Sequence, residues 1–506
     1  MDLGDLLETA ARENKRENAV ICGGERLAYP DLADLATRCA EDLARAGARP
    51  GDRVAALFPN CHLYLATYFA ALQSRLVLVP INLRLHPNEV REILHHSGSR
   101  VLIGDPQSVA RIFGQGPRPS EEGWITRVLD GPGGEDPAEL IEGAAQLYYT
   151  SGTTGRPKGV ILTRDNLAAH AAMTIDELAF TGDDAWLHAA PMFHLADAWA
   201  VWTVTAAAGT HVMMPRYDPD AAYEQIESAG ITITNLVPTM LLGLLEAASH
   251  RGRGLPSLRL LLSGGAPISP STVARVEDLL GCPYAQTYGL TESSPFLTFS
   301  LLDESLKALP REAQLRQRAR TGRAARGVEL RVVHPSGSAE FRDVPADDAS
   351  VGEVIVRGPT ITPGYWRDEE STRLAFLGGW FHTGDLGTID RYGFINLVDR
   401  AKDVIITGGE NVYSTEVENA IYEHAAVLEA AVFGVPDETW GETVRAAVVL
   451  REPGTVSPAE LIAFCRERIG RFKCPRAVDI VEALPRTGSG KIDKKALRAP
   501  FRIGGD

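Results

Sequence analysis

Short apolar runs alternate along this chain with longer amphipathic or alanine-rich stretches. Four of the short runs predict strands, at residues 185–190, 211–215, 231–237 and 258–262, and the residues between them follow helical patterns. Parallel strands have to be joined by a segment that crosses back over the sheet, and that segment is usually a helix. The alternation therefore predicts an α/β fold in which helices cover parallel sheets.

The chain has 506 residues, too many for one ordinary domain, so two or more domains are expected. Residues 114–137 are rich in Gly, Pro and acidic residues, which is typical of a surface loop. Residues 303–323 are highly charged and predict an exposed excursion. After Val351 the pattern changes to short strands and turns, which favours a small barrel-shaped subdomain.

The last hundred residues are interpreted as a separate unit with two well-marked helices. In "STEVENAIYEH", Thr415 and Glu418 have the spacing of a capping box. In "SPAELIAFCRERI", Ser457 is the expected cap, Pro458 the first-turn proline and Glu460 the acid of a second capping box.

Composition excludes several classes of function. A net charge of -15 argues against general binding of nucleic acid. The first 18 residues are acidic and polar and do not resemble a signal peptide, and no apolar run approaches the length of about 20 residues that a membrane-spanning helix needs. Six scattered cysteines, without C-x-x-C spacing or a nearby His, are expected to be reduced packing residues and not a zinc site. We therefore expect a cytoplasmic protein that acts on small molecules.

The stretch "YYTSGTTGRPKGV", residues 148–160, combines hydroxyls, glycines and one lysine between two apolar runs. Glycines let a backbone approach a ligand closely, hydroxyls donate hydrogen bonds, and Lys158 supplies a compact positive charge, so a polyphosphate is the expected ligand. The P-loop of ATPases is excluded, because Gly159 stands where that motif needs Ser or Thr after the lysine. The alternative is a polar turn between two strands.

Further glycine-rich polar stretches follow apparent strands, which is where open α/β sheets bind ligands. In "AQTYGLTES", Tyr288 offers a stacking face, Thr287 and Thr291 offer hydroxyls, and Glu292 offers a carboxylate for magnesium. Similar stretches are "LLLSGGAP", "WFHTGDLG", "VDRAKDVIITGGENVYSTEVE" and "LPRTGSGKIDKKALR".

In this order, and over nearly the whole chain, these motifs resemble the adenylate-forming superfamily of acyl-CoA synthetases, adenylation domains and luciferases, and specifically its fatty acid:CoA ligase branch. The resemblance implies a large N-terminal domain, residues 1–400, made of two sheet-and-helix subdomains and a small β-barrel-like subdomain. It also implies a small, mobile α+β C-terminal domain, residues 401–506, with a hinge at Lys402.

The resemblance also implies a role for each matching residue. The expected ATP- and AMP-binding residues are Thr150, Ser151, Gly152, Thr153, Thr154, Lys158, Gly265, Ala266, Thr287, Tyr288, Gly289, Asp385 and Arg400. The expected catalytic residues are Lys491, Thr291, Glu292 and Arg400, with Glu292 as the magnesium ligand. The expected acyl pocket consists of His194, Val237, Gly264 and Gly265, and the coenzyme A channel of Gly408, Gly409 and Glu410.

Each of these residues also has an ordinary structural interpretation. Asp385 alone suits a turn or a helix cap, and Glu292 alone suits an exposed acid at a helix start. His194 lies on an apolar segment, where a histidine is usually a core residue. Lys402 beside Asp403 suits a solvated surface charge. The ordered set of motifs favours the functional roles over these alternatives.

The expected reaction is ATP-dependent activation of a carboxylic acid through acyl-AMP, followed by transfer to coenzyme A, with Mg²⁺ required. The pocket segments contain no Arg or Lys and predict an apolar monocarboxylic acid. The charged stretch near Pro310 resembles members that act on medium- or long-chain fatty acids, which rank first, ahead of aryl or cinnamic-type acids. An adenylation enzyme that loads a carrier protein and a catalytically inactive nucleotide sensor are the rivals, and a homodimer is left open. Amino acids are disfavoured, because His194 follows Phe193 where amino-acid-activating members have an aspartate.

Overall fold

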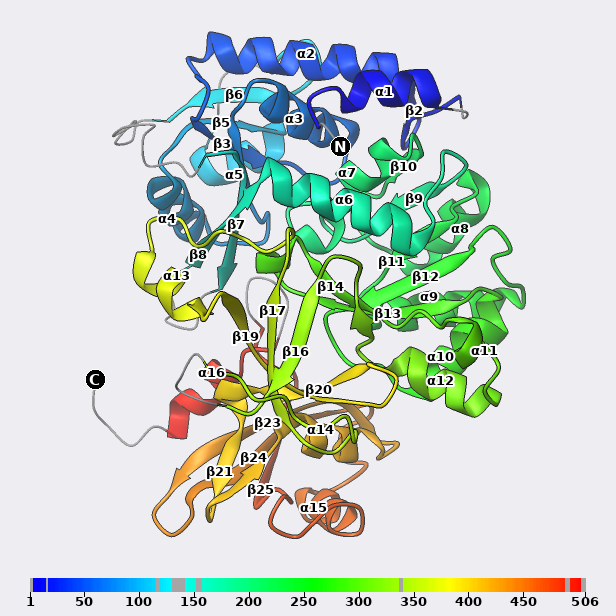
Figure 1. The fold of residues 1–506 in the computed structure, drawn as a ribbon, viewed down its shortest axis with the longest axis vertical. Coiled ribbons are helices and arrows are strands. Elements are labelled where there is room, and N and C mark those ends of the chain that lie inside the picture. Colours follow the sequence, from blue (N-terminus) through cyan, green and yellow to red (C-terminus); the bar gives the residue numbers. More distant parts are fainter. Residues whose placement is uncertain are drawn as a thin grey trace. The chain divides into compact units, whose positions relative to one another are not determined.

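The structure is a computed structural model, and it describes residues 3–14, 17–114, 119–129, 142–151, 157–335, 340–486 and 492–501. The chain divides into two compact units. Unit 1 consists of Met1–Leu330, Val356–Phe381 and Tyr392–Ile395, and unit 2 of Arg331–Ile355, His382–Arg391 and Asn396–Asp506. Figure 1 shows the helices and strands of both units, coloured along the sequence from blue to red.

Unit 1 contains a nine-stranded sheet in the order β15-β14-β13-β12-β11-β9-β10-β1-β2. Strands β1 and β9 to β13 run parallel to their neighbours in this set. At the two ends of the sheet, β2 pairs antiparallel with β1, β14 pairs antiparallel with β13, and β15 pairs antiparallel with β14. The strand bounds are β1 Val20–Cys22, β2 Glu25–Leu27, β9 Ala185–His188, β10 Thr210–Met213, β11 Ile233–Asn235, β12 Leu260–Gly264, β13 Tyr284–Gly289, β14 Phe296–Phe299 and β15 Arg323–Ala324. The predicted strands 185–190, 211–215, 231–237 and 258–262 coincide with β9, β10, β11 and β12, with differences only at their ends.

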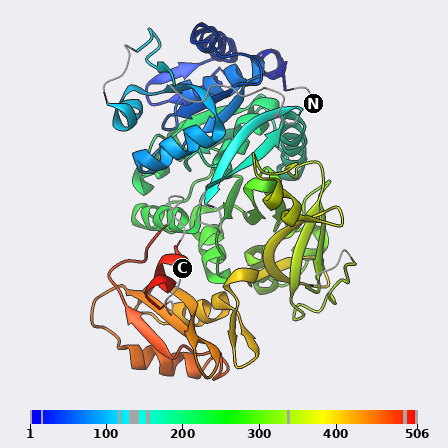
Figure 2. The same ribbon diagram turned by 90° about the vertical axis from the view of Figure 1, so that its left-hand side faces the viewer.

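A six-stranded sheet, in the order β6-β5-β3-β4-β7-β8, lies N-terminal to most of these strands in the sequence. Its bounds are β3 Arg53–Leu57, β4 Val77–Pro80, β5 Ser99–Gly104, β6 Ile125–Val128, β7 Ala144–Ser151 and β8 Pro157–Thr163. Strands β7 and β8 form an antiparallel hairpin, visible as the long cyan pair in Figure 2. Strand β6 lies inside the predicted loop 114–137 and buries Ile125, so part of that loop prediction is wrong.

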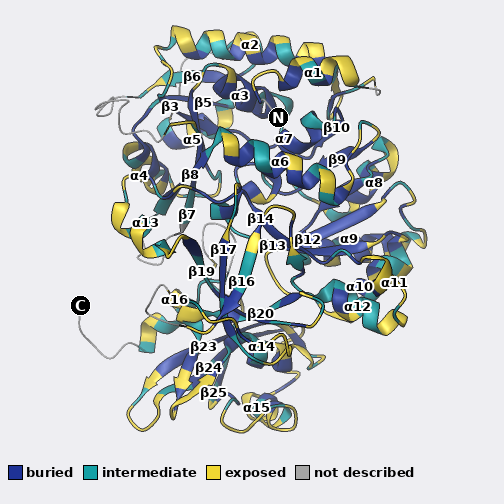
Figure 3. Cartoon of the chain, viewed as in Figure 1, coloured by how far each residue is buried: buried dark blue, intermediate teal, exposed yellow. Residues whose placement is uncertain are grey.

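Helices cover both sheets, which explains why the parallel strands are apolar on both faces. The helix bounds are α1 Leu6–Glu13, α2 Tyr29–Arg45, α3 His62–Gln73, α4 Pro87–Ser97, α5 Pro106–Phe113, α6 Arg164–Leu178, α7 Leu195–Ala206, α8 Pro219–Ala229, α9 Pro238–Arg251, α10 Pro270–Arg275, α11 Glu304–Lys307, α12 Arg311–Ala319 and α13 Glu369–Ala375. Helices α8 and α9 share one core cluster with Ala185 and Leu187 of β9 and Leu261 of β12. Figure 3 shows the parallel strand β12 of this unit mostly buried, while α2 and α8 expose their outer faces.

The charged segment 303–323 folds differently from the prediction. It forms α11 and α12, and Leu306 is buried in a cluster with Phe394. Arg318 is partly buried, and its Nε lies 3.1 Å from Glu277 Oε1. The charge of this segment therefore belongs to the outer faces of two packed helices and does not make the whole segment an exposed excursion.

A five-stranded sheet contains β16 Glu329–Val333, β17 Gly352–Arg357, β18 Phe376–Leu377, β19 Trp380–Ile389 and β20 Ile395–Arg400. It occupies the region of the predicted barrel-like subdomain but begins before Val351. Another five-stranded sheet contains β21 Ile405–Thr407, β22 Glu410–Val412, β23 Val427–Asp437, β24 Gly441–Leu450 and β25 Ala477–Ile480. With it are α14 Ser414–Tyr422, α15 Pro458–Arg466 and α16 Lys494–Arg498.

The two predicted capping boxes have different outcomes. Ser457 caps α15 and forms a capping box with Glu460, as predicted. The box at α14 is wrong, because the helix begins at Ser414 after Tyr413, with no side-chain cap bond. The Thr415 hydroxyl donates to the Val398 carbonyl, and Glu418 Oε1 accepts from the Val432 amide. The spacing of Thr415 and Glu418 suits a capping box, but both side chains are hydrogen-bonded to backbone groups of β20 and β23 instead.

Candidate active site

The first glycine-rich motif is carried by the β7–β8 hairpin. Thr150 and Lys158 are directly opposite each other in the antiparallel pair, so the predicted phosphate-binding loop lies between two adjacent strand ends. Gly152, Thr153 and Thr154 lie outside the described residues, as does the side chain of Ser151. The motif is therefore also a connection between strands, and its ligand role stays a prediction.

Lys158 and Glu292 are brought together by an aromatic side chain that the sequence did not mark. The Lys158 Nζ lies 5.2 Å from the centre of the Tyr365 ring and donates to Ser371 Oγ at 2.6 Å. The Tyr365 hydroxyl donates to Glu292 Oε1 at 2.9 Å. Burial, with the negative charge of Glu292, raises the pKa of Tyr365 above its ordinary value, so this hydroxyl remains a donor. Tyr365 thus links the predicted phosphate lysine to the predicted magnesium carboxylate.

Backbone pairing explains why Tyr365 lies at this point. The Trp366 amide donates to the Gly159 carbonyl at 2.8 Å, and the Ile161 amide donates to the Gly364 carbonyl at 3.1 Å. The segment around Tyr365 is therefore an additional strand-like partner of β8. Only Gly364 and the aromatic pair after it could have drawn attention to this segment in the sequence.

Glu292 lies in a 3-10 turn, η3 Thr291–Ser293, that follows β13. It is half-buried, and the Thr362 amide also donates to its carbonyl at 2.8 Å. Because Tyr365 holds one carboxylate oxygen, the other can face a cation, which is the donor chemistry that Mg²⁺ prefers. Within the described residues there is no group of three or more His, Cys, Asp or Glu side chains suited to a metal ion. A single carboxylate fits a magnesium ion that is bound mainly by phosphates and water.

The C-terminal ends of β12 and β13 bring together the predicted adenine-binding residues. Gly264 and Thr287 are partners in the parallel pair, and the Thr287 hydroxyl donates to the Ser263 carbonyl at 3.1 Å. A side chain at Gly264 would collide with Thr287, so the two strands can only approach with glycine there. Gln286, which the sequence did not mark, donates to the Ala266 carbonyl at 2.8 Å and fixes the exposed turn after β12. Tyr288 and Gly289 complete β13.

Two of the predicted acyl-pocket residues border the same space. Gly265 has φ +85, a conformation that favours glycine, and a β-carbon built on it would lie 4.0 Å from Val237 Cγ1. Val237 precedes α9, and both residues are at least partly exposed. Because no other described residue, apart from the chain neighbours of Gly265, has an atom within 4 Å of that position, the backbone at Gly265 is accessible to a ligand, which fits a bound acid or nucleotide.

His194 is the residue immediately before α7 and is half-buried. Its ring lies against Phe193, with 4.8 Å between ring centres. Ala196, in the first turn of α7, is exposed, whereas Asp197 beside it is fully buried. The first turn of α7 therefore presents one side to an open surface and the other to the sheet.

In unit 2, Asp385 and Arg400 form an ion pair. Asp385 on β19 is 4% exposed, and its Oδ1 lies 3.0 Å from Arg400 Nε on β20. Because Asp385 is a buried residue inside a strand, it is neither a helix cap nor an exposed turn residue. A buried carboxylate held by a guanidinium on one oxygen is well suited to accept hydrogen bonds from ribose hydroxyls.

The predicted hinge and channel residues also lie in unit 2. Lys402 is exposed within the 3-10 turn η4 Ala401–Asp403. Gly408 and Gly409 connect β21 to β22 with φ +60 and +84, as a two-residue hairpin turn with both central residues at positive φ requires. Glu410 begins β22, and the Trp440 ring packs closely over Gly408. Lys491 lies outside the described residues.

The model of the family described as AMP-binding enzyme matches residues 7–366, and that of the AMP-binding enzyme C-terminal domain matches residues 416–491. The chain belongs to the AMP-binding enzyme family. It is 36% identical to a feruloyl-CoA synthase of Amycolatopsis sp over 99% of both chains. It is 35% identical to a long-chain-fatty-acid–CoA ligase of Thermus thermophilus, over 99% of this chain and 96% of that one.

Solved structures agree with this assignment. The o-succinylbenzoate CoA synthetase of Bacillus subtilis, in complex with an acyl-adenylate, matches with a TM-score of 0.82 and 29% identity, over 99% of this chain and 98% of that one. The AMP-binding enzyme described here is thus an adenylate-forming acid–thiol ligase that uses ATP, Mg²⁺ and coenzyme A. The predicted family, mixed α/β fold and enzyme class are confirmed.

Two further expectations can be compared with the described part of this AMP-binding enzyme. All six cysteines are free thiols. No helix among the described residues is long and apolar enough to cross a membrane. The predicted boundary at residue 400, between a large N-terminal domain and a mobile C-terminal domain, stays a prediction. The two compact units divide the chain at other positions.

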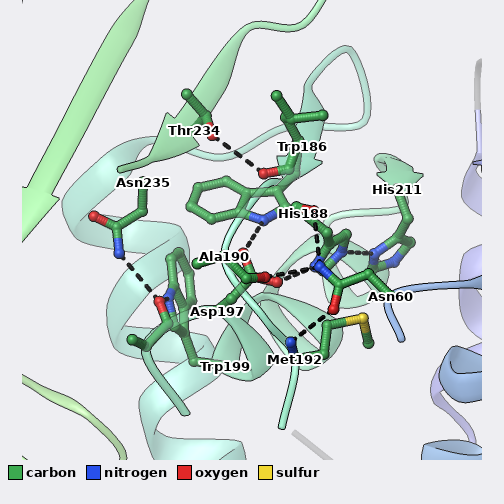
Figure 4. Close-up of polar contacts among 12 residues, drawn as sticks. Asn60, Trp186, His188, Ala190, Met192, Asp197, Trp199, His211, Thr234 and Asn235 are labelled. Atoms are coloured by element: carbon green, nitrogen blue, oxygen red, sulfur yellow. Dashed lines mark hydrogen bonds and ion pairs between the residues drawn. The ribbon is translucent and has the colours of Figure 1, made fainter. Parts of the chain in front are cut away.

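A buried polar chain beneath α7 was missed altogether. Asp197 Oδ2 lies 2.6 Å from His188 Nδ1, and His188 Nε2 lies 3.0 Å from His211 Nδ1 (Figure 4). Trp186 Nε1 donates to Asp197 Oδ1 at 3.3 Å. Burial, with the neighbouring His188, lowers the pKa of His211 well below its ordinary value, so His211 is neutral. In the sequence these residues are single polar positions in apolar runs and carry no motif.

Proposed function

We propose that this enzyme activates a compact, apolar monocarboxylic acid, with aryl or cinnamic-type acids ahead of long-chain fatty acids. The carboxylate attacks the α-phosphate of ATP, which releases pyrophosphate and leaves acyl-AMP, and the thiol of coenzyme A then displaces AMP. Each step breaks one bond to a good leaving group. The acid class is the part of this function that rests on the pocket residues.

The observation that carries the acid class is the aromatic packing behind α7. Trp199 is fully buried, with its ring centre 4.8 Å from that of Trp186 and 4.9 Å from that of Phe296. A long acyl tail directed along this side of α7 would have to displace Trp199, which a compact ring does not. The described segments 193–206, 235–240 and 262–267 contain no Arg or Lys to pair a second carboxylate.

Two other considerations move aryl acids ahead of fatty acids. The preference for fatty acids rested on the charged segment 303–323, which the structure shows as two helices packed on their own unit. The relatives divide between the two acid classes, and the feruloyl-CoA synthases are among the most similar. Fatty acids therefore stay the second candidate.

We propose the remaining roles from the sequence motifs and from the contacts described for the candidate active site. Lys158, Thr150 and the loop between them bind the β- and γ-phosphates, and Glu292 binds magnesium. The turn after β12 and the end of β13 bind adenine, and Asp385 with Arg400 binds the ribose. Lys491 joins the substrate carboxylate to the α-phosphate. A cytoplasmic location and a homodimer stay predictions.

A panel of acids tests this function. The enzyme is given ATP, Mg²⁺, coenzyme A and one of cinnamate, benzoate, octanoate, palmitate, malonate or phenylalanine, and kcat/KM is measured for each. We expect AMP and pyrophosphate as products, never ADP, and the highest kcat/KM with an aryl acid. Octanoate or palmitate in first place would restore the fatty acid assignment, and malonate or phenylalanine in first place would overturn the apolar pocket.

A further inference from the structure

The buried chain beneath α7 begins and ends on that helix. Its order is Asp197, His188 on β9, His211 on β10, and Thr205, whose Oγ1 lies 2.9 Å from His211 Nε2. All four side chains belong to residues that are 0% exposed. Asp197 and Thr205 are separated by about two turns of α7. The helix is therefore attached to two neighbouring strands at two points along its length.

The protons in this chain can be assigned without leaving a buried group unpaired. In one such assignment Asp197 accepts from Trp186 Nε1 and His188 Nδ1, His188 Nε2–H donates to His211 Nδ1, and His211 Nε2–H donates to Thr205 Oγ1. Both oxygens of the buried Asp197 carboxylate then have a hydrogen-bond donor. A buried charge is tolerated only when it is paired and hydrogen-bonded in this way.

Such a chain does what apolar packing cannot do for α7. Apart from Asp197 and two threonines, the helix sequence "LADAWAVWTVTA" is apolar, and apolar contacts are not directional. Small shifts of α7 along or about its axis would replace one set of apolar contacts by another. Directional hydrogen bonds to fixed strand positions exclude those shifts, and setting a register is the best-attested use of buried polar groups.

The position that the chain fixes is the first turn of α7. Asp197 lies three residues after His194, and the Asp197 amide donates to the His194 carbonyl at 3.1 Å. The same turn carries exposed Ala196, whose carbonyl accepts from Asn235 Nδ2 at 3.1 Å. The preceding segment is held by Asn60, which donates to the His188 and Ala190 carbonyls and accepts from the Met192 amide (Figure 4).

We propose that Asp197 is a positioning residue for the acid substrate: through His188, His211 and Thr205 it sets the register of α7 and thereby the shape of the pocket wall at His194 and Ala196. Asp197 touches neither the acid nor ATP. It determines which acids fit and leaves the binding of ATP unchanged. This inference rests on the proposed function, in which the first turn of α7 borders the acid.

Asp197→Ala and Asp197→Asn separate this role from simple stabilisation. Alanine leaves His188 Nδ1 and Trp186 Nε1 without their acceptor and frees the start of α7. Asparagine can restore the whole chain, because its oxygen accepts from Trp186 and its amide donates to His188 Nδ1, while His188 keeps the proton on Nε2 for His211. Asparagine is thus the conservative variant expected to rescue selectivity.

Asp184→Ala is the matched control. Asp184 precedes the same strand, β9, at its other end, is 3% exposed, and pairs with Arg259 at 2.7 Å from Nε to Oδ1. Its loss removes a buried carboxylate from the same sheet but leaves α7 attached. We expect it to lower the unfolding temperature and to leave the relative use of different acids as in the wild type.

The measurement is acid-dependent ATP–pyrophosphate exchange with cinnamate and octanoate, with KM for ATP and the unfolding temperature of every variant. We expect Asp197→Ala to change the cinnamate-to-octanoate ratio of kcat/KM by about tenfold or more, as repacking a pocket wall by a methylene or two does, with KM for ATP within about twofold. Asp197→Asn should keep the ratio within about threefold of the wild type.

Thr205→Val, which breaks only the far end of the chain, keeps the test decisive if Asp197→Ala does not fold, and it should shift the ratio in the same direction by a smaller factor. An unchanged ratio in whichever of these two variants folds would overturn the inference, as would an equal shift in Asp184→Ala. If the wild type makes no AMP with any acid, the proposed function fails instead.

Discussion

Two polar clusters of unit 1 differ in their surroundings. The first, Lys158, Tyr365, Glu292 and Ser371, is half-buried, and its members can exchange their present partners for a ligand. The second is the fully buried chain of Asp197, His188, His211 and Thr205, whose members have no access to solvent. We therefore expect the same kinds of side chain to serve as ligand contacts in one place and as a positional constraint in the other.

The difference predicts that mutations in the two clusters separate cleanly. Loss of a group in the half-buried cluster should change the use of ATP and Mg²⁺ for every acid alike. Loss of a group in the buried chain should change which acid is used. The following variants are given in order of decreasing expected effect. Lys491 and Lys402 belong to neither cluster and test the two half-reactions, whereas Glu292 and Tyr365 test the half-buried cluster.

Lys491→Ala should have the largest effect, and only on adenylate formation. Loss of a charge that acts in the transition state should slow this half-reaction by about two to three orders of magnitude for every acid. Synthetic acyl-AMP should still be converted to acyl-CoA at near the wild-type rate, because we expect Lys491 to be needed only in the domain arrangement that forms the adenylate. Single-turnover kinetics of the two halves measures both effects.

Lys402→Pro is the counterpart of that variant, since proline fixes φ and removes an amide donor at the proposed hinge. It should keep adenylation and impair thioester formation. Equal slowing of both halves by Lys491→Ala, in a protein that folds normally, would contradict the rotating-domain assignment and make Lys491 a fixed structural lysine.

Glu292→Gln should slow adenylate formation by about a hundredfold, because an amide oxygen binds magnesium more weakly than a carboxylate does. The Tyr365 hydroxyl can still donate to the amide oxygen, so the fold around η3 should persist. The checks are the dependence of the rate on Mg²⁺ concentration and the cinnamate-to-octanoate ratio. A normal Mg²⁺ dependence would remove Glu292 from the metal site.

Tyr365→Phe should have a smaller effect, about tenfold on kcat/KM for Mg·ATP, which is typical for a partner that orients a metal-binding carboxylate. The ring is retained, so the contact with Lys158 should remain, while the hydrogen bond to Glu292 is lost. The matched control is Tyr149→Phe on strand β7 of the β7–β8 hairpin. This variant removes a hydroxyl that is hydrogen-bonded to His96 Nδ1 at 2.8 Å. If both variants lose activity equally, Tyr365 stabilises the hairpin and does not orient Glu292.

A change in acid selectivity caused by Tyr365→Phe would weaken the comparison itself. It would mean that the two clusters are coupled across unit 1, with the hairpin and α7 moving together. Measuring the cinnamate-to-octanoate ratio for Tyr365→Phe and KM for ATP for Asp197→Ala in one experiment therefore tests both sides.

The sequence by itself determined the family, the fold class and the enzyme class. Ends of strands rich in glycine and hydroxyls, such as those at Thr150 and Thr287, are where open α/β sheets bind ligands, so their chemistry can be predicted without coordinates. The capping box of Ser457 and Glu460 could also be predicted, because its two residues are close neighbours in the sequence.

Tertiary structure decided the contacts between residues far apart in the chain. Tyr365 contacts Lys158 and Glu292 only because its segment pairs with β8. Thr415 and Glu418 do not form the predicted capping box, because they bond to backbone groups of the neighbouring strands β20 and β23. Asp197, His188 and His211 occupy apolar runs where no local spacing marks them. Their role depends on the contact of α7 with β9 and β10, since the role of a buried polar group is set by the partner that the fold places beside it.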